Sequence, residues 1–228
     1  MSLVPQRIRV LASPGSLPGA GPCTLGPVEL PAGRPVGRLW LTDDLVPGSG
    51  DVWLALAGCF ESTGLWPLVV SEPLTSEHFP YLLEDPALND PAAVLAVPLG
   101  APELDTTNPV VYLAETPWLP GDGQIALVPV IEPADVVART GWGGATASAL
   151  STGQLSAVLR SWQRRYGTLP LAIGASTLFL ACAASPSDAE TVLGEHQAFC
   201  RLNTAEGLPP EQYLDFLRTS AVWPFAWA

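Results

Sequence analysis

Residues 151–183, STGQLSAVLRSWQRRYGTLPLAIGASTLFLACA, carry the clearest fold signal in the chain. Apolar residues recur at helical spacing over residues 155–166 and give this predicted helix one apolar face. The positions that share the face are Leu155, Val158, Leu159, Trp162 and Tyr166. Strands are expected next over residues 169–173 and 177–183, so the segment predicts a helix that packs on a sheet.

Both ends of this helix carry their own signals. Ser151 and Gln154 have the spacing of a capping box, in which each side chain satisfies a free backbone N–H group, and Gly167 is placed to end the helix. Its arginines are Arg160, Arg164 and Arg165. Because they lie toward the C-terminal end, we expect them to complement the helix dipole.

A second helix and strand are predicted earlier in the chain. Asp51 is the expected cap of a helix that Gly64 ends, with apolar positions at Val52, Trp53, Leu56 and Phe60. The apolar run over residues 65–70 follows as a strand, and Pro67 favours a place at the edge or the end of a sheet.

The remaining N-terminal sequence predicts fewer elements. Proline and glycine interrupt residues 12–37 so often that we expect a loop. Residues 125–131 predict a strand, and residues 133–140 predict a short helix that Gly141 ends.

The C-terminal sequence predicts two more helices. Ser187 and Glu190 form a second expected capping box, before a helix with apolar positions at Val192, Leu193, His196, Phe199 and Cys200. Another helix is expected over residues 209–217. The last eight residues, AVWPFAWA, are so apolar that we expect them to dock on the body of the protein.

These elements predict a mixed α+β fold in which amphipathic helices cover a central sheet. Three regions are expected: a Pro/Gly-rich segment over residues 1–38, an acidic α/β region over residues 39–140, and a C-terminal domain over residues 141–228, which can pack as one unit with the acidic region.

A faint internal echo links two of these units. Residues 52–70 and 155–173 both read as helix, glycine, Pro-Leu and strand, with a constant offset of 103 residues. The echo has two alternative explanations. One is duplication of a helix–strand unit, and the other is chance in a chain rich in Gly, Pro and Leu.

The charge of the chain is strongly one-sided. Its 228 residues hold 22 Asp and Glu against 10 basic residues, all Arg, for a net charge of −12. Fifteen of the acids fall between Asp43 and Asp135, and residues 39–138 contain no Arg. This charge argues against nucleic acid and anionic membranes as partners.

Other compositional features bear on location. The four cysteines, Cys23, Cys59, Cys182 and Cys200, form no dense disulfide framework, and no apolar run is long enough to span a bilayer. The absence of Lys and the scarcity of Ile and Asn fit a GC-rich bacterial genome. We therefore expect a cytoplasmic bacterial protein.

No catalytic or cofactor motif stands out. The Gly-rich run over residues 141–146 is neither a dinucleotide nor a phosphate-binding motif, and it is expected to be a turn held by Trp142. The acid pairs Asp43-Asp44 and Glu84-Asp85 are adjacent in sequence, so they give no support to paired-carboxylate chemistry. The sequence indicates no cofactor and leans away from an enzyme.

One cluster has the spacing of metal ligands. His196 and Cys200 share a helix face, Glu195 is adjacent, and Cys182 is a third ligand if its strand packs on this helix. A further hypothesis is that His196 and Cys200 form a nucleophilic Cys–His pair. The apolar stripe through Val192 instead favours a structural role for His196 and Cys200.

Several C-terminal motifs mark a family. VLRSWQRRYGTLPLAIG, EHQAFC, YLDFL and the terminal WPFAW resemble the bacterial domain-of-unknown-function family 4253 over residues 135–228, and GWGGAT also resembles a stretch of that family. The resemblance implies no activity, but it draws attention to Trp142, Trp162, Glu195, His196, Phe199, Cys200, Trp223 and Trp227. This chain has Arg-Leu-Asn over residues 201–203 in place of Pro-Asp-Asn, and Ala228 in place of a final Asp.

Two functions from different classes remain. The first is a non-enzymatic interaction module that binds a basic protein through the acidic surface, with immunity proteins that cap basic toxins as one analogous class. The second is a small enzyme or metal-binding protein that uses Glu195, His196 and Cys200. A solvated acidic face kept for solubility is the plain alternative to the first. The sequence does not indicate an oligomeric state.

Overall fold

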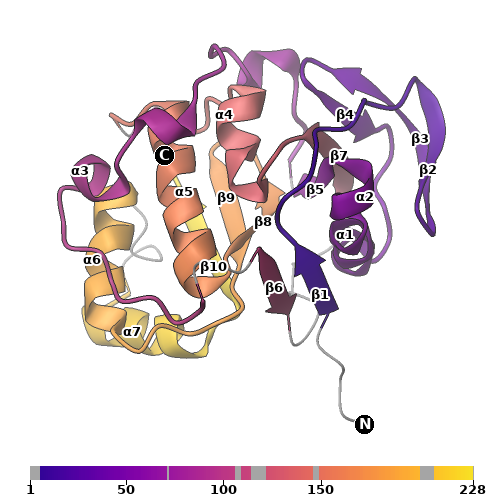
Figure 1. The fold of residues 1–228 in the computed structure, drawn as a ribbon. Coiled ribbons are helices and arrows are strands. Elements are labelled where there is room, and N and C mark those ends of the chain that lie inside the picture. Colours follow the sequence, from indigo (N-terminus) through magenta and orange to yellow (C-terminus); the bar gives the residue numbers. More distant parts are fainter. Residues whose placement is uncertain are drawn as a thin grey trace, which may run out of the picture.

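A mixed sheet forms the centre of the molecule (Figure 1). The computed structural model describes residues 6–70, 72–105, 109–113, 122–145, 149–200 and 208–227. Within them the sheet has eight strands in the order β10-β9-β8-β5-β7-β4-β3-β2. Their bounds are β2 Gly21–Leu25, β3 Val28–Val36, β4 Leu39–Thr42, β5 Leu65–Val70, β7 Gln124–Pro129, β8 Leu169–Ile173, β9 Thr177–Ala181 and β10 Val222–Ala226. A separate pair joins β1 (Gln6–Arg9) to β6 (Val110–Leu113).

Helices pack around this sheet, so the predicted α+β class is confirmed. The α-helices are α1 Ser49–Gly58, α2 Phe60–Thr63, α3 Pro91–Leu95, α4 Val136–Thr140, α5 Thr152–Tyr166, α6 Ala189–Phe199 and α7 Pro210–Thr219. Short 3-10 turns are η1 Ser76–His78, η2 Pro86–Leu88 and η3 Pro133–Asp135. None of the described helices is long and apolar enough to cross a membrane.

The helix expected from the opening segment is α5, and its signals are confirmed. The Ser151 N–H donates to Oε1 of Gln154 at 2.9 Å, and Ser151 Oγ accepts from the Gln154 N–H at 3.3 Å. Gly167 ends the helix in the left-handed conformation, with φ of 64°. Trp162 is fully buried, which confirms the predicted apolar face.

Strand β5 has its predicted bounds, but the edge position inferred from Pro67 is wrong. All six of its residues are buried, and it lies between β7 and β8. Its pairing with β8 begins at Val69, beyond Pro67, so the missing N–H of the proline falls outside that ladder.

The loop predicted over residues 12–37 is also wrong in part, because it contains the β2–β3 hairpin. Leu25 pairs with Val28 across a turn at Gly26 and Pro27. Gly26 has φ of 57°, a conformation that favours glycine. Glycine and proline therefore form the turn of this hairpin, and they do not prevent the flanking residues from forming strands.

Two predicted helix caps belong to neighbouring residues. Gly48, not Asp51, is the N-cap of α1, and Asp51 lies in the first turn. At α6 the cap is Asp188, whose carboxylate accepts from the Thr191 N–H at 3.1 Å. Ser187 instead donates its own N–H to Glu103 at 2.7 Å. A carboxylate accepts this bond more strongly than a hydroxyl does, which explains the shift by one residue.

The internal echo has a structural counterpart. β5 and β8 are parallel neighbours, and Val69 and Val70 pair with Ala172 and Ile173, residues 103 positions later. Gly64 caps α2 with φ of 63°, as Gly167 caps α5. The two helix–glycine–strand units therefore lie side by side with equivalent residues paired.

Candidate functional site

The seven side chains marked in the sequence as candidate site residues come together inside the molecule. They are Trp142, Trp162, Glu195, His196, Cys200, Trp223 and Trp227, and each is at most 3% exposed. They come from the turn after α4, from α5, from the end of α6, and from β10 and the residue after it. Burial of this extent makes the cluster part of the packed interior.

The C-terminal segment supplies one wall of this cluster, so its predicted docking is confirmed. Phe225 and Trp227 lie on the same buried side of β10 and its end. Trp162 stacks on Phe225, with ring centroids 5.4 Å apart, and Phe199 meets Phe225 edge to face at 5.1 Å. Trp142 meets Trp227 edge to face at 5.6 Å. Aromatic pairs of this geometry stabilise a core beyond the area they bury.

A buried ion pair joins α5 to α6 at the side of this cluster. Nη1 of Arg165 lies 2.8 Å from Oε1 of Glu195, and Nη2 lies 2.5 Å from Oε2. The same carboxylate accepts from the Trp162 indole N–H at 2.6 Å and from the Gly100 backbone N–H at 2.5 Å. Four donors therefore satisfy a carboxylate that is 0% exposed, which offsets the cost of burying its charge.

Arg165 lies in the last turn of α5, as expected for a residue that complements the helix dipole, but its side chain is buried rather than exposed. It is 7% exposed, and its Nη1 also donates to the Gly100 carbonyl and the Tyr166 hydroxyl, both at 2.9 Å. Burial raises the pKa of Tyr166 above its usual value. The signal was present in the spacing, because Arg165 follows Val158 by seven residues, two turns along the buried face.

His196 lies among aromatic rings on the inner side of α6. Its Nδ1 is 2.9 Å from the Tyr213 hydroxyl, and its Nε2 has no hydrogen-bond partner among the described residues. The rings of Trp162 and Trp223 lie 4.9 and 4.6 Å from the imidazole, measured between centroids. Burial, and then the charge of Arg165, lowers the pKa of His196 to about 3. The imidazole is therefore neutral at physiological pH and has the contacts of a core residue.

The two cysteines considered as ligands bind backbone oxygens. Cys200 Sγ lies 3.0 Å from the Ala226 carbonyl oxygen, and Cys182 Sγ lies 3.1 Å from that of Ala184. Burial raises the pKa of Cys182 to about 12, so its thiol stays protonated. Over the described ranges, no group of three or more His, Cys, Asp and Glu side chains is arranged to hold a metal ion.

Trp142 anchors the Gly-rich turn, as the sequence predicted. Its indole N–H donates to the Gly174 carbonyl at 2.9 Å, which ties the turn to the end of β8. The Gly143 N–H donates to the His78 carbonyl at 2.8 Å. Thr146 lies outside the described residues.

These elements are the ones that the comparison with protein families identifies. Residues 124–228 match the model of DUF4253, a domain of unknown function. The match confirms the resemblance drawn from the motifs and begins earlier, at β7. No curated protein and no solved structure matches the chain.

The DUF4253 region shares its sheet with the rest of the chain. β5 lies before residue 124, yet it sits between β7 and β8, which are both within the match. The departures noted over residues 201–203 and at Ala228 lie outside the described residues. The DUF4253 motif residues that are described build a hydrogen-bonded aromatic core over the β8–β9–β10 side of the sheet.

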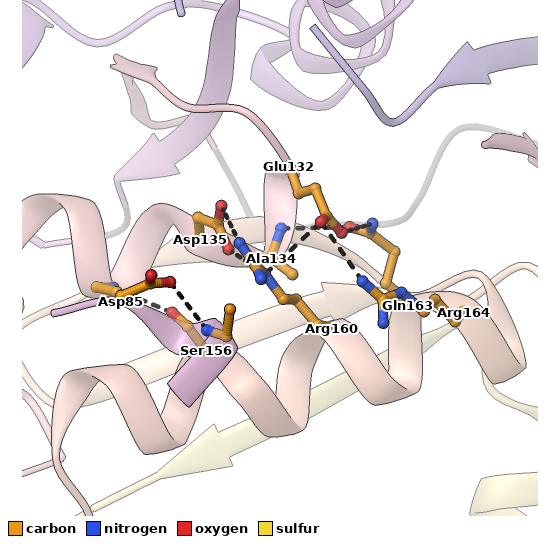
Figure 2. A network of polar contacts seen from close by, with 10 residues as sticks. Asp85, Glu132, Ala134, Asp135, Ser156, Arg160, Gln163 and Arg164 are labelled. Atoms are coloured by element: carbon orange, nitrogen blue, oxygen red, sulfur yellow. Dashed lines mark hydrogen bonds and ion pairs between the residues drawn. The ribbon is translucent and has the colours of Figure 1, made fainter. Parts of the chain in front are cut away.

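A second polar network holds α5 against the segment before it (Figure 2). Arg160 binds Asp135 through two bonds, Nε to Oδ1 at 2.6 Å and Nη2 to Oδ2 at 2.9 Å. Glu132 lies within 3.8 Å of Arg160 and 3.5 Å of Arg164. Hydrogen bonding to Asp135 raises the pKa of Arg160. The acidic segment is therefore neutralised at its C-terminal end.

Proposed function

We propose that this protein is a non-enzymatic interaction module that binds a basic protein partner through its acidic surface. The observation that carries the proposal is where the arginines lie relative to the acids of residues 39–138. Ion pairs hold the carboxylates at the two ends of that segment, namely Asp43, Glu61, Glu132 and Asp135. Exposed carboxylates between them include Glu72, Glu77, Glu84, Asp85 and Asp90, and no ion pair joins any of these five to an arginine that the structure describes.

Exposed carboxylates without a cationic side chain in contact have a physical consequence when they share one stretch of surface. They create a negative potential that attracts a cationic surface over several ångströms and repels an anionic one. A basic partner relieves their mutual repulsion when it binds. Among known classes, immunity proteins that neutralise basic toxins work in this way, and we propose that class by analogy.

The alternative function, an enzyme or metal-binding protein that uses Glu195, His196 and Cys200, gains no support from their surroundings. Glu195 is enclosed by four donors, and His196 and Cys200 are at most 1% exposed. A catalytic group needs a place for substrate beside it. The contacts of these side chains are instead the Arg165 guanidinium, the Tyr213 hydroxyl, aromatic rings and backbone.

Affinity capture tests the proposal. The purified protein is immobilised, extract of the source cells is passed over it, and bound proteins are eluted with a rising salt gradient. We expect to capture a basic protein that elutes as the salt concentration rises. Salt screens the attraction between exposed charges, and the screening length is about 10 Å at 0.1 M salt. A captured partner that is acidic, or that stays bound in molar salt, contradicts the proposal.

A further inference from the structure

We infer that the partner docks on residues 81–90, where its apolar side chains cover exposed leucines and its arginine or lysine side chains meet the neighbouring carboxylates. This inference rests on the proposed function and names the surface that performs it. The occupant is a basic, amphipathic segment of another protein.

Apolar exposure is concentrated on this stretch. The described part of the chain has eight large apolar side chains that are exposed, and four of these lie within eight consecutive residues. These four are Tyr81 at 43%, Leu82 at 80%, Leu83 at 48% and Leu88 at 84%. Clustered exposed leucines cost free energy in water, and on soluble proteins they typically mark an interaction surface.

The backbone that presents these leucines is held in place. Tyr81 donates its N–H to the Gly141 carbonyl at 3.2 Å, and its own carbonyl accepts from Arg38 at 3.0 Å. Glu84 accepts from the Ser151 hydroxyl at 2.6 Å and from the Gly153 N–H at 2.7 Å, at the start of α5. Pro86 is buried. Because the segment is already ordered, a partner does not have to order it on binding.

Charge decides which occupant fits. Asp85 and Asp90 are exposed within this stretch, and Glu77 lies just before it. An anionic lipid surface and a second copy of this chain, with a net charge of −12, would both bring negative charge against these carboxylates. A partner with apolar and cationic side chains satisfies both features of the surface.

A cavity of about 270 Å³ opens beside Tyr81 and gives one partner side chain a place to enter. The residues that line it include Trp142, Leu150, Leu155 and Glu84. Apolar walls with a carboxylate suit the long stem and charged end of arginine or lysine.

Binding of a defined peptide tests the inference. The probe is a fluorescein-labelled helical peptide with leucine on one face and arginine on the other, and a scrambled peptide of the same composition is the reference. Affinity is measured by fluorescence anisotropy at low and at physiological salt. Two variants alter the surface, Leu82→Ser/Leu88→Ser and Asp85→Asn/Asp90→Asn. Asparagine keeps the caps that Asp85 and Asp90 provide to Ala87 and Ala92.

Matched controls change equivalent side chains elsewhere. Tyr112→Ser alters an exposed apolar residue of β6, which is 52% exposed. Glu29→Gln/Glu211→Gln removes two exposed charges, as the Asp85/Asp90 variant does. Thermal unfolding confirms that each variant is folded before its affinity is compared.

The expected result is a loss of at least tenfold in affinity for both surface variants and less than twofold for both controls. Equal losses for the two charge variants, with no effect of the leucine substitutions, would overturn the docking surface but leave an acidic interaction module. Failure of wild-type protein to prefer the amphipathic peptide over the scrambled one also overturns the docking surface. Absence of salt-dependent binding to either peptide overturns the proposed function as well.

Discussion

Arg165 of α5 and Glu195 of α6 face each other as a two-bond ion pair inside the protein, with nitrogen–oxygen distances of 2.8 and 2.5 Å. The Trp162 indole and the Gly100 backbone complete the shell around the carboxylate. One residue of the family motif EHQAFC therefore links the two helices that cover the aromatic core. We expect the pair to fix how these helices pack, because a broken buried ion pair leaves a charge without a partner in the interior.

Glu195→Gln is expected to destabilise the protein strongly. The amide keeps the shape of the side chain but leaves the buried Arg165 charge without its counter-ion, a loss of about 3–5 kcal/mol for a broken buried pair. Chemical denaturation of wild type and variant measures the difference. In the matched double variant, Arg165→Met/Glu195→Gln, part of the stability should return because no unpaired charge remains. If the single variant unfolds like wild type, the pair does not hold the helices together.

Acid should destabilise the protein through His196. Its pKa is about 3 in the folded protein and near 6.5 in the unfolded chain, so between these values the unfolded chain binds more protons. The free energy of unfolding therefore falls as pH drops below about 6.5, by about 2 kcal/mol at pH 5 from this group. Arg165, Glu195 and Tyr213 are the ionisable groups near it.

The control for this pH dependence is the other histidine. His196→Phe should flatten the decline between pH 6.5 and 5. His78→Gln, at a partly exposed histidine outside the aromatic core, is the matched substitution. Unfolding curves across this pH range supply the measurement. Identical slopes for wild type and His196→Phe would show that His196 does not carry the acid sensitivity.

Removal of aromatic side chains from β10 should be costly. Phe225→Ala is expected to lose about 3–5 kcal/mol of stability, because the ring is 1% exposed and contacts α5 and α6. Val222→Ala, at a half-buried position in the same strand, should lose much less. Deletion of residues 222–228 should lower the melting temperature further still. A truncated protein that melts like the full chain would mean that the strand does not support the core.

Purified protein should contain no stoichiometric zinc that depends on His196. The Nδ1 atom is engaged with Tyr213, and Cys200 lies against the Ala226 carbonyl. His196→Ala is expected to cost about 1–3 kcal/mol through a lost hydrogen bond and a cavity. Elemental analysis of wild type and variant decides the matter. Zinc that disappears with His196 would favour the metal-binding alternative instead.

Local signals in the sequence predicted the elements whose formation depends on near neighbours. The capping box at Ser151, the apolar face around Trp162 and the strand at residues 65–70 were all found in the structure. The prediction of an edge strand from Pro67 was wrong because the effect of a proline depends on where the neighbouring strand begins to pair. The same holds for the hairpin around Gly26, which sequence spacing alone reads as a loop.

The candidate site depended on contacts between distant segments. Resemblance to the family identified Trp142, Glu195 and Trp227 as a set, but only the fold brings them together. The sequence predicted only that Arg165 complements the helix dipole, because it lies near the C-terminal end of the helix. Its partner is 30 residues later, on another helix, and no local pattern marks such a pair.

The association rate across a salt series shows whether the acidic surface recruits a basic partner. The partner isolated by affinity capture is mixed with the protein in a stopped-flow instrument from about 0.01 M to 0.15 M salt, where the screening length falls from about 30 Å to about 8 Å. We expect the association rate to drop at least tenfold over this range, with a smaller change in the dissociation rate. An association rate that does not change with salt would contradict this expectation and leave the carboxylates as solubilising surface.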